Sequence, residues 1–310
     1  MRDGCPFCEG NEAETPSERD AFARTQLEEK ALDNYRRPNS PGWMVRSVPN
    51  RYPFVSPDLE QSIQQIGPYL ESPNAGIQEV LVDVPYHVER LSELTEVEFE
   101  YLIHFYHRRM TQLRKEIRWK YVQLFKNQGA EAGASLSHLH SQLVGLPFVP
   151  AKVEWEQQFL RRYGQERGLC YHCEVLAYEQ REKKRFVTET DFFSVFCPFA
   201  SIFPYEMYVV PKLHSPCFVH CLREELDDLG RLLQKLVRKL EAVLPVPAYN
   251  LVLKNSPWED SDQEMCEDEY YHWRLEILPR MTRIAGYELG TGDYVNPVLP
   301  EKAAQCLRDA

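Results

Sequence analysis

The chain has 310 residues and a formal net charge of −11 at neutral pH. This length allows one large or two medium domains, and so acidic a balance argues against a nucleic acid partner, which needs clustered Lys and Arg. The sequence has no run of about 18 apolar residues that would indicate membrane insertion, and no signal-type apolar segment that would indicate export. We therefore expect a cytoplasmic protein without membrane contact.

The first motif along the chain is a Cys-x-x-Cys pair, Cys5 and Cys8, and a second pair follows at Cys170 and Cys173. Nine cysteines, an odd number, look less like a disulfide framework than like thiols and metal ligands. A lone pair of this kind can also be a redox motif. The residues that accompany each pair decide between the two interpretations.

Three elements follow the first cysteine pair. Residues 79–84 form a short apolar segment that predicts a strand, and His87 comes just after it. Residues 96–118 are charged, with apolar positions at three- and four-residue spacing, which predicts a helix. Residues 121–127 predict a second strand. A loop of small residues then runs to Ser135, as expected where backbone amides approach a phosphate.

The next segment reads His138-Leu139-His140-Ser141-Gln142. In an extended chain, side chains at alternate positions share one face, so two imidazoles and an amide line up together. The apolar residues that follow, closed by Pro147, favour a strand. A pair of hydrogen-bonded core histidines is the alternative, but two histidines and a glutamine on one face after a small-residue loop favour a catalytic site.

The same order of elements recurs in the second part of the chain. A strand at 206–211 precedes His214, a leucine-rich helix is expected at 223–244, and a strand at 249–255 leads toward His272. The acidic run Glu259 to Glu269 is the place for an insertion. The sequence therefore predicts an α+β fold of two related half-domains with mainly antiparallel sheets and packed helices. Their limits are 1–155 and 165–310, joined by charged, helix-like sequence.

The duplication separates the histidines into two groups. Each half holds a Cys-x-x-Cys, a histidine after the first strand and a histidine before the last one. Two thiolates and two imidazoles are the ligand set of a closed, structural zinc site, so we expect two such sites per chain. The two quartets are Cys5, Cys8, His87, His138 and Cys170, Cys173, His214, His272.

His140 has no duplicate, because Arg274 stands at the equivalent position and Glu276 stands where the first half has Gln142. Arginine stays protonated and cannot be a nucleophile. We therefore predict one catalytic half, in which His140 attacks phosphorus and forms a covalent adduct. Gln142 would donate to a phosphate oxygen, and the loop from Gly133 to Ser135 would hold the other oxygens.

With these motifs the sequence resembles the galactose-1-phosphate uridylyltransferase family, a branch of the histidine-triad superfamily, along nearly its whole length. The resemblance implies two histidine-triad-like domains, of which the second lacks the nucleophile. It also implies transfer of a nucleoside monophosphate from a nucleotide sugar to a sugar 1-phosphate through a nucleotidyl-histidine. The residues that carry the resemblance are Asn127, Gly129, Gly133, Ser135, the 138–142 motif, Cys5, Cys8, His87 and the tail 285–292.

The resemblance further implies substrate contacts. Asn50 and Arg51 fall where the family contacts base and ribose, although uridylyltransferases often have an acidic residue where this chain has Arg51. Tyr287 and Glu288 match a segment that contacts sugar hydroxyls from the neighbouring subunit of a homodimer. A turn-rich strand connection is the alternative for this tail.

Two departures from the family leave alternatives open. Leu139 and Ser141 stand where the hexose uridylyltransferases usually have Pro and Gly, and the Ser form and the second cysteine pair look more like the ADP-glucose phosphorylase branch, in which phosphate is the acceptor. The basic residues that usually precede the first cysteine pair are also missing, and either other cations such as Arg36, Arg37, Arg46 or Arg51 replace them or the start is trimmed. A noncatalytic zinc-stapled nucleotide-binding protein and a hydrolase are further alternatives.

Overall fold

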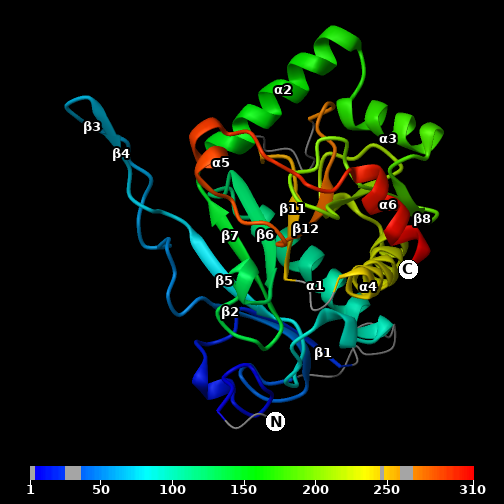
Figure 1. The fold of residues 1–310 in the computed structure, drawn as a ribbon. Helices are drawn as coiled ribbons and strands as arrows, with labels where there is room; N and C mark the ends of the chain where they lie inside the picture. The colour runs from blue at the N-terminus through cyan, green and yellow to red at the C-terminus, as the bar shows by residue number, and fades with distance from the viewer. Residues whose placement is uncertain (1–3, 25–35, 245–247, 259–267) are drawn as a thin grey trace.

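The structure, a computed structural model, describes residues 4–24, 36–244, 248–258 and 268–310. Its main feature is a ten-stranded sheet in the order β1-β2-β5-β7-β6-β11-β12-β10-β9-β8 (Figure 1). Every neighbouring pair in this sheet is antiparallel, which confirms the expected fold class. The strands are β1 Asp20–Ala23, β2 Trp43–Pro49, β5 Ile77–Val82, β6 Tyr121–Gln128, β7 His140–Leu146, β8 Phe186–Glu189, β9 Phe193–Phe196, β10 Met207–Pro211, β11 Tyr249–Lys254 and β12 Arg274–Pro279.

The sheet is built from two matching sets of five strands. Strand β6 of the first half pairs with its repeat β11, and outward from this seam the order β7-β5-β2-β1 mirrors β12-β10-β9-β8. At the seam, Asn127 lies opposite Asn250. The two halves therefore share one continuous sheet. The acidic run proposed as an insertion lies mostly outside the described residues.

Two equivalent helices, α1 Glu96–Arg114 and α4 Arg223–Val243, pack against each other on one face of the sheet (Figure 1). Thr95 caps α1 by accepting from the Glu98 amide, and Glu98 accepts from the Thr95 amide in return. The leucine stripe of α4 lies in the core. Helix α1 ends four residues before the predicted end because the chain turns to bury Trp119 before β6. The opposite face of the sheet is left for the histidine motif.

The remaining elements lie around this core. Helix α2 occupies the charged segment between the two halves and ends at Gly168, whose positive φ of 73° suits glycine. The tail that sequence left open between a site segment and a strand connection forms a short helix, α5. The further bounds are α2 Ala151–Arg167, α3 Tyr171–Glu182, α5 Gly286–Thr291, α6 Pro300–Asp309, β3 Gln64–Ile66, β4 Tyr69–Glu71 and the 3-10 turns Glu12–Glu14, Leu91–Glu93, Ala130–Ala132 and Phe218–His220.

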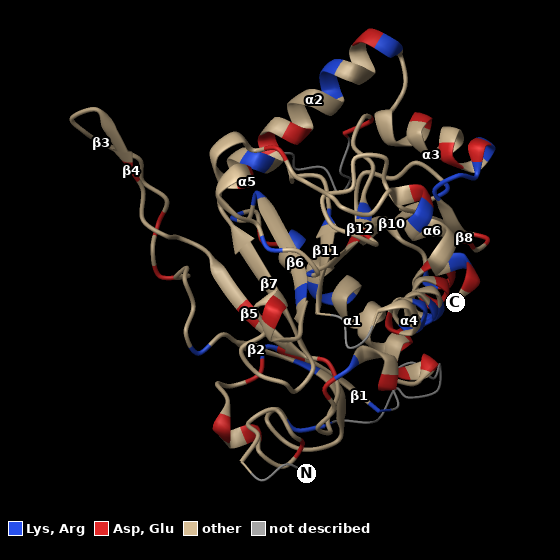
Figure 2. Cartoon of the chain, in the orientation of Figure 1, with Lys and Arg blue, Asp and Glu red and all other residues tan. Residues whose placement is uncertain are grey.

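Strands β3 and β4 form an arm that projects from the body of the molecule (Figure 1). Its large apolar side chains are exposed, among them Tyr69 and Leu70. The tip of the arm carries no charged residue (Figure 2). An isolated two-stranded hairpin is only marginally stable in water, so this arm has few contacts of its own that stabilise it. Among the described residues, no helix is long and apolar enough to cross a bilayer.

Candidate functional site

The structure brings the first predicted quartet together. The ligand atoms of Cys5, Cys8, His87 and His138 all lie within 4.8 Å of one another. The sulfur of Cys5 is 3.4 Å from Nδ1 of His138, and the sulfur of Cys8 is 3.7 Å from the same nitrogen. Tetrahedral zinc with bonds of about 2.0 to 2.3 Å separates its ligands by about 3.5 Å. The spacing and the donor set therefore fit a metal ion of this kind.

The second quartet is assembled in the same way in the other half. Its four ligand atoms, from Cys170, Cys173, His214 and His272, also lie within 4.8 Å of one another. The sulfur of Cys173 is 3.4 Å from Nδ1 of His214 and 3.5 Å from Nδ1 of His272. His172, between the two cysteines, is not one of these four and accepts a hydrogen bond from Arg274 instead.

Two backbone carbonyls fix the rings of His138 and His140. Nε2 of His138 donates to the Val84 carbonyl at 2.9 Å, so its Nδ1 lone pair faces the cysteines. Nδ1 of His140 donates to the His138 carbonyl at 2.9 Å. Since a carbonyl only accepts, the His140 proton is on Nδ1 and the lone pair is on Nε2. The two histidines of the motif are therefore oriented for different tasks.

His140 lies in the wall of a cavity of about 340 Å³. The cavity brings together five of the predicted site residues, namely Asn50, Arg51, Ser135, His140 and Gln142. Its other lining residues come from the N-terminal segment, β2 and the residues after it, β5 and the loop before β7, and are Pro6, Phe7, Glu14, Thr15, Pro16, Val48, Pro49, Tyr52, Val80 and Leu136. The size is suited to a nucleotide-sized ligand.

The environment of His140 favours its neutral form. Burial lowers the pKa of His140, and the nearby Lys126 ammonium lowers it further. The ring is 5.5 Å from that of Phe7, measured between centroids, and only 5% of the residue is exposed. A neutral imidazole keeps the Nε2 lone pair that a nucleophile needs. Phe7 had no signal in the sequence beyond its place between the two cysteines.

A buried polar network supports the motif strand from the opposite face of the sheet. Lys126 donates to Asp83 at 2.6 Å and to the His140 carbonyl at 2.9 Å. Ser141 donates to Asp83 at 3.0 Å and also contacts the hydroxyl of Tyr106 on α1. Because these groups are buried, each depends on its partners, and together they fix the backbone that carries His140.

Four predicted substrate residues do not line this cavity, namely Asn127, Gly133, Tyr287 and Glu288. Asn127 donates weakly to the Gly133 carbonyl at 3.4 Å and accepts from Asn250 at 2.9 Å, so it shapes the loop from the seam. Tyr287 and Glu288 lie on α5, where the Tyr287 side chain is exposed. These two residues are separate from the cavity of their own chain.

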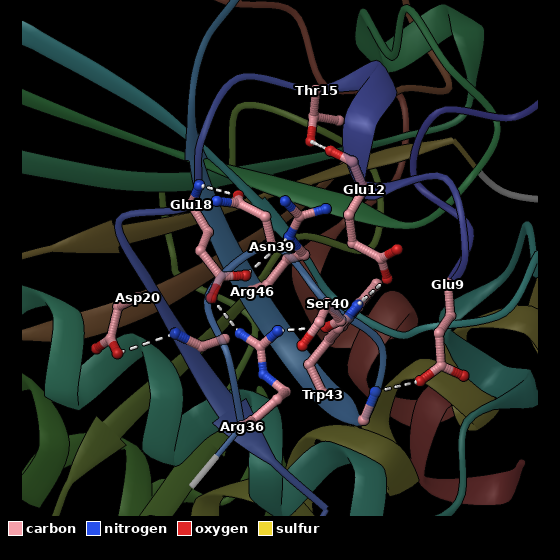
Figure 3. A network of polar contacts seen from close by, with 12 residues as sticks. Glu9, Glu12, Thr15, Glu18, Asp20, Arg36, Asn39, Ser40, Trp43 and Arg46 are labelled. Atoms are coloured by element: carbon pink, nitrogen blue, oxygen red, sulfur yellow. Dashed lines mark hydrogen bonds and ion pairs between the residues drawn. The ribbon is translucent and has the colours of Figure 1, made fainter.

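Two of the basic residues considered as replacements for missing cations, Arg36 and Arg46, have other partners. Figure 3 shows Arg36 and Arg46 directed at Glu18, in a network that covers β2. In the same network, buried Glu12 accepts from the indole nitrogen of Trp43 at 2.8 Å. Arg51 lines the cavity, whereas Arg37 does not. The N-terminal segment is therefore bound to the sheet largely through its acidic side chains.

The equivalent place in the second half is filled by charged side chains. Arg274 donates to Glu276 at 2.9 Å and to Glu156 at 2.7 Å, and Lys254 also pairs with Glu156 at 2.7 Å. Burial raises the pKa of Glu156, but Arg274 and Lys254 outweigh it and hold this pKa at about 2. Glu156 comes from α2 and gave no sequence signal, because its partners are distant in the chain.

Comparison with known proteins finds relatives that match nearly the whole chain. A family model described as a domain of unknown function, DUF4921, matches residues 88–309. ADP-glucose phosphorylase of Arabidopsis thaliana is 34% identical over 98% of this chain and 81% of its own length. Galactose-1-phosphate uridylyltransferase of Thermotoga maritima is 30% identical over 84% of this chain and 82% of its own length.

Solved structures of the same two kinds of enzyme have a similar fold. The crystal structure of ADP-glucose phosphorylase from Arabidopsis thaliana with bound ADP-glucose is 32% identical, with a TM-score of 0.83 over all of this chain and 92% of that one. A structure described as uridylyltransferase is 28% identical, with a TM-score of 0.81 over all of this chain and 91% of that one.

Fold, site and relatives together define an enzyme of the nucleotidyltransferase class. More narrowly, the chain belongs to the galactose-1-phosphate uridylyltransferase family and has features of its ADP-glucose phosphorylase branch.

Proposed function

We propose that the chain transfers a nucleoside monophosphate from a nucleoside diphosphate sugar to phosphate, through a nucleotidyl-His140 intermediate. One observation carries the proposal. A buried, neutral His140 presents its Nε2 lone pair in the wall of a cavity that Gln142 also lines. The fixed protonation of Nδ1 is what an attacking imidazole requires.

In the first step, Nε2 of His140 attacks the α-phosphorus of the nucleotide sugar. A phosphorus–nitrogen bond forms, the bond from that phosphorus to the bridging oxygen breaks, and the sugar 1-phosphate leaves with the bonding electrons. The positive charge on the ring is stabilised by the hydrogen bond from Nδ1 to the His138 carbonyl. In the second step, an oxygen of the acceptor attacks the same phosphorus and frees His140.

Gln142 and the small-residue loop serve the phosphate. The Gln142 amide would donate to a nonbridging oxygen as charge shifts during transfer. Ser135 lines the cavity and can bind a second oxygen, and Gly133, with a φ of 91°, allows the tight turn before it. Asn50 and Arg51 are assigned to the base and ribose end, and Arg51 also supplies a positive charge.

Similarity to ADP-glucose phosphorylase favours adenine as the base and phosphate as the acceptor. The relative at 34% identity and the solved structure with bound ADP-glucose are both named ADP-glucose phosphorylase. Leu139, Ser141 and Arg51 also differ from the usual uridylyltransferase pattern. Transfer of uridylate between UDP-glucose and a hexose 1-phosphate is the second candidate, supported by the relative at 30% identity.

We further infer that each Cys/His quartet holds a zinc ion with a structural role. All four protein ligands are present in each cluster, which leaves no open position for substrate. The ion of the first cluster would hold His138, and through its carbonyl would support the ring of His140. Zinc itself takes no part in the transfer in this proposal.

We also propose a homodimer in which Tyr287 and Glu288 reach the cavity of the partner subunit. The exposed side chains near α5, which include Met281 and Leu289, and the exposed apolar side chains of the arm β3–β4, such as Leu70, support a contact between copies. If so, mixing equal amounts of the His140→Ala and Glu288→Ala variants restores roughly a quarter of the wild-type activity. Half of the dimers are then mixed, and each mixed dimer has one intact site out of two. Activity no greater than that of the separate variants would contradict shared sites.

The central test uses α-³²P-labelled ADP-glucose and UDP-glucose in separate incubations. We expect acid-labile, alkali-stable label on the wild-type protein and none on His140→Ala. Phosphate and galactose 1-phosphate, added in turn, identify the acceptor that removes the label. Label that persists in His140→Ala, or no label with either donor, would overturn the proposal. Free nucleoside monophosphate without any acceptor would indicate a hydrolase.

A further inference from the structure

Gln78 on β5 lies beside the cavity without lining it. Only 8% of the residue is exposed. Its side chain makes two hydrogen bonds. The backbone N–H of Phe54 donates to Oε1 at 3.0 Å, and Nε2 donates to Oε1 of Gln142 at 2.8 Å. Gln78 thereby connects the segment after Arg51 with the amide of Gln142.

The directions of these bonds follow from chemistry rather than from the placement of amide atoms. A backbone N–H can only donate, so the atom of Gln78 that meets Phe54 must be the oxygen. The other end of the Gln78 amide is then an NH₂ group, which can only donate. It must therefore meet the oxygen of Gln142, which leaves the NH₂ group of Gln142 for the cavity.

We propose that Gln78 is a positioning residue that holds the Gln142 amide with its NH₂ group toward the phosphate site. The inference rests on the proposed nucleotidyl transfer for its kinetic consequence, but the hydrogen bond itself exists without substrate. A glutamine amide has two orientations of similar shape, and only one of them donates to a phosphate oxygen. The reversed orientation would place a carbonyl oxygen against the anion.

The same contact ties Gln142 to the nucleotide end of the cavity. The backbone N–H of Asn50 donates to the backbone carbonyl of Gln78 at 2.9 Å, and the backbone N–H of Phe54 donates to the Gln78 side chain. Residues 50 to 54 are thus attached to Gln78 at both ends. A ligand that orders this segment also orders the phosphate donor.

The kinetic test compares two substitutions of nearly equal size. Gln78→Met removes the constraint, so we expect kcat to fall about tenfold while KM changes less. Gln78→Glu presents an acceptor to Gln142 and reverses its amide, so kcat falls about 100-fold. Gln180→Met is the matched control, because Gln180 donates to Ser194 in the other half and its loss leaves kcat unchanged.

A double substitution separates positioning from general destabilisation. In a Gln142→Met background, Gln78→Met should have no further effect on kcat, since the amide that it orients is gone. Independent, multiplying effects of the two substitutions would overturn the inference. So would a wild-type kcat in Gln78→Met.

A spectroscopic test does not depend on activity. With ¹⁵N-labelled glutamine side chains, we expect one Gln78 NH₂ proton to be shifted downfield and protected from solvent exchange. Both features should vanish in Gln142→Met. If they persist there, the hydrogen bond is absent and the inference fails, whatever the donor-labelling experiment gives. If they vanish but no nucleotidyl adduct forms with any donor, the proposed function fails and the orientation of Gln142 stands.

Discussion

The two metal clusters are built alike, but the strands next to them carry different chemistry. After His138 the chain places a neutral imidazole and an amide in a cavity wall. After His272 it places Arg274 and Glu276, which are buried and form an ion cluster with half-buried Glu156. Burial and the Arg274 guanidinium also hold the pKa of His172 at about 3, so this ring stays neutral as an acceptor.

This contrast shows how one scaffold can support either reaction or stability. In the first half, polar groups face open space and are available to a ligand. In the second half, the side chains at the same positions pair with each other, and neither of them is an imidazole that could attack phosphorus. Removing one member of such a charge cluster lowers the stability of the fold, because the remaining charges are left buried without a partner.

The largest difference is expected between His140→Ala and Arg274→Met. His140→Ala should lower nucleotidyl transfer more than about 1,000-fold and change the free energy of unfolding by less than about 1 kcal/mol. Arg274→Met should retain transfer in the folded protein but lose about 3 kcal/mol of stability, because Glu276 loses its cation. Transfer rates and urea unfolding measure both effects.

A paired change is the control for the second half. Replacing Arg274 and Glu276 together with Met and Leu should recover much of the lost stability, since Glu156 keeps Lys254. If the double variant is as unstable as Arg274→Met, the charge account is wrong.

The cysteine pairs give the next effect. Metal analysis should find about two zinc ions in the wild-type chain and about one in either Cys5→Ser or Cys170→Ser. Both variants should unfold at lower temperature. Cys5→Ser should also slow transfer, because His138 supports His140, whereas folded Cys170→Ser should keep its rate. Equal loss of rate in the two variants would contradict the division of roles.

The smallest effect is expected at Ser141. Ser141→Ala leaves the backbone in place and removes one hydroxyl from the network of Asp83 and Tyr106. We expect a loss of about 1 to 2 kcal/mol in unfolding free energy, with transfer reduced less than about fivefold. A large loss of transfer without loss of stability would instead give Ser141 a direct part in the chemistry.

Much of the fold was open to prediction because the repeats mark it. The cysteine pairs, His87 and His214, the two helices and the strands that became β6 and β11 all have local patterns and a partner in the other half. Gln78 and Glu156 have neither, and Lys126, although it recurs as Lys254, gives no sequence signal for its partner Asp83. Their roles depend on contacts between strands or with α2, which only the folded chain brings together. The helical form of α5 was missed because glycine and threonine in this segment indicate a turn.

The pairing of β6 with β11 has a consequence for biosynthesis. Asn250 follows its partner Asn127 by 123 residues, so β6 remains an unpaired edge until most of the chain has left the ribosome. At roughly 5 to 20 residues per second this interval lasts on the order of ten seconds. An open edge of this kind can recruit the same strand of a neighbouring nascent chain. Variants that slow folding of the second half should therefore aggregate more than their equilibrium stability suggests.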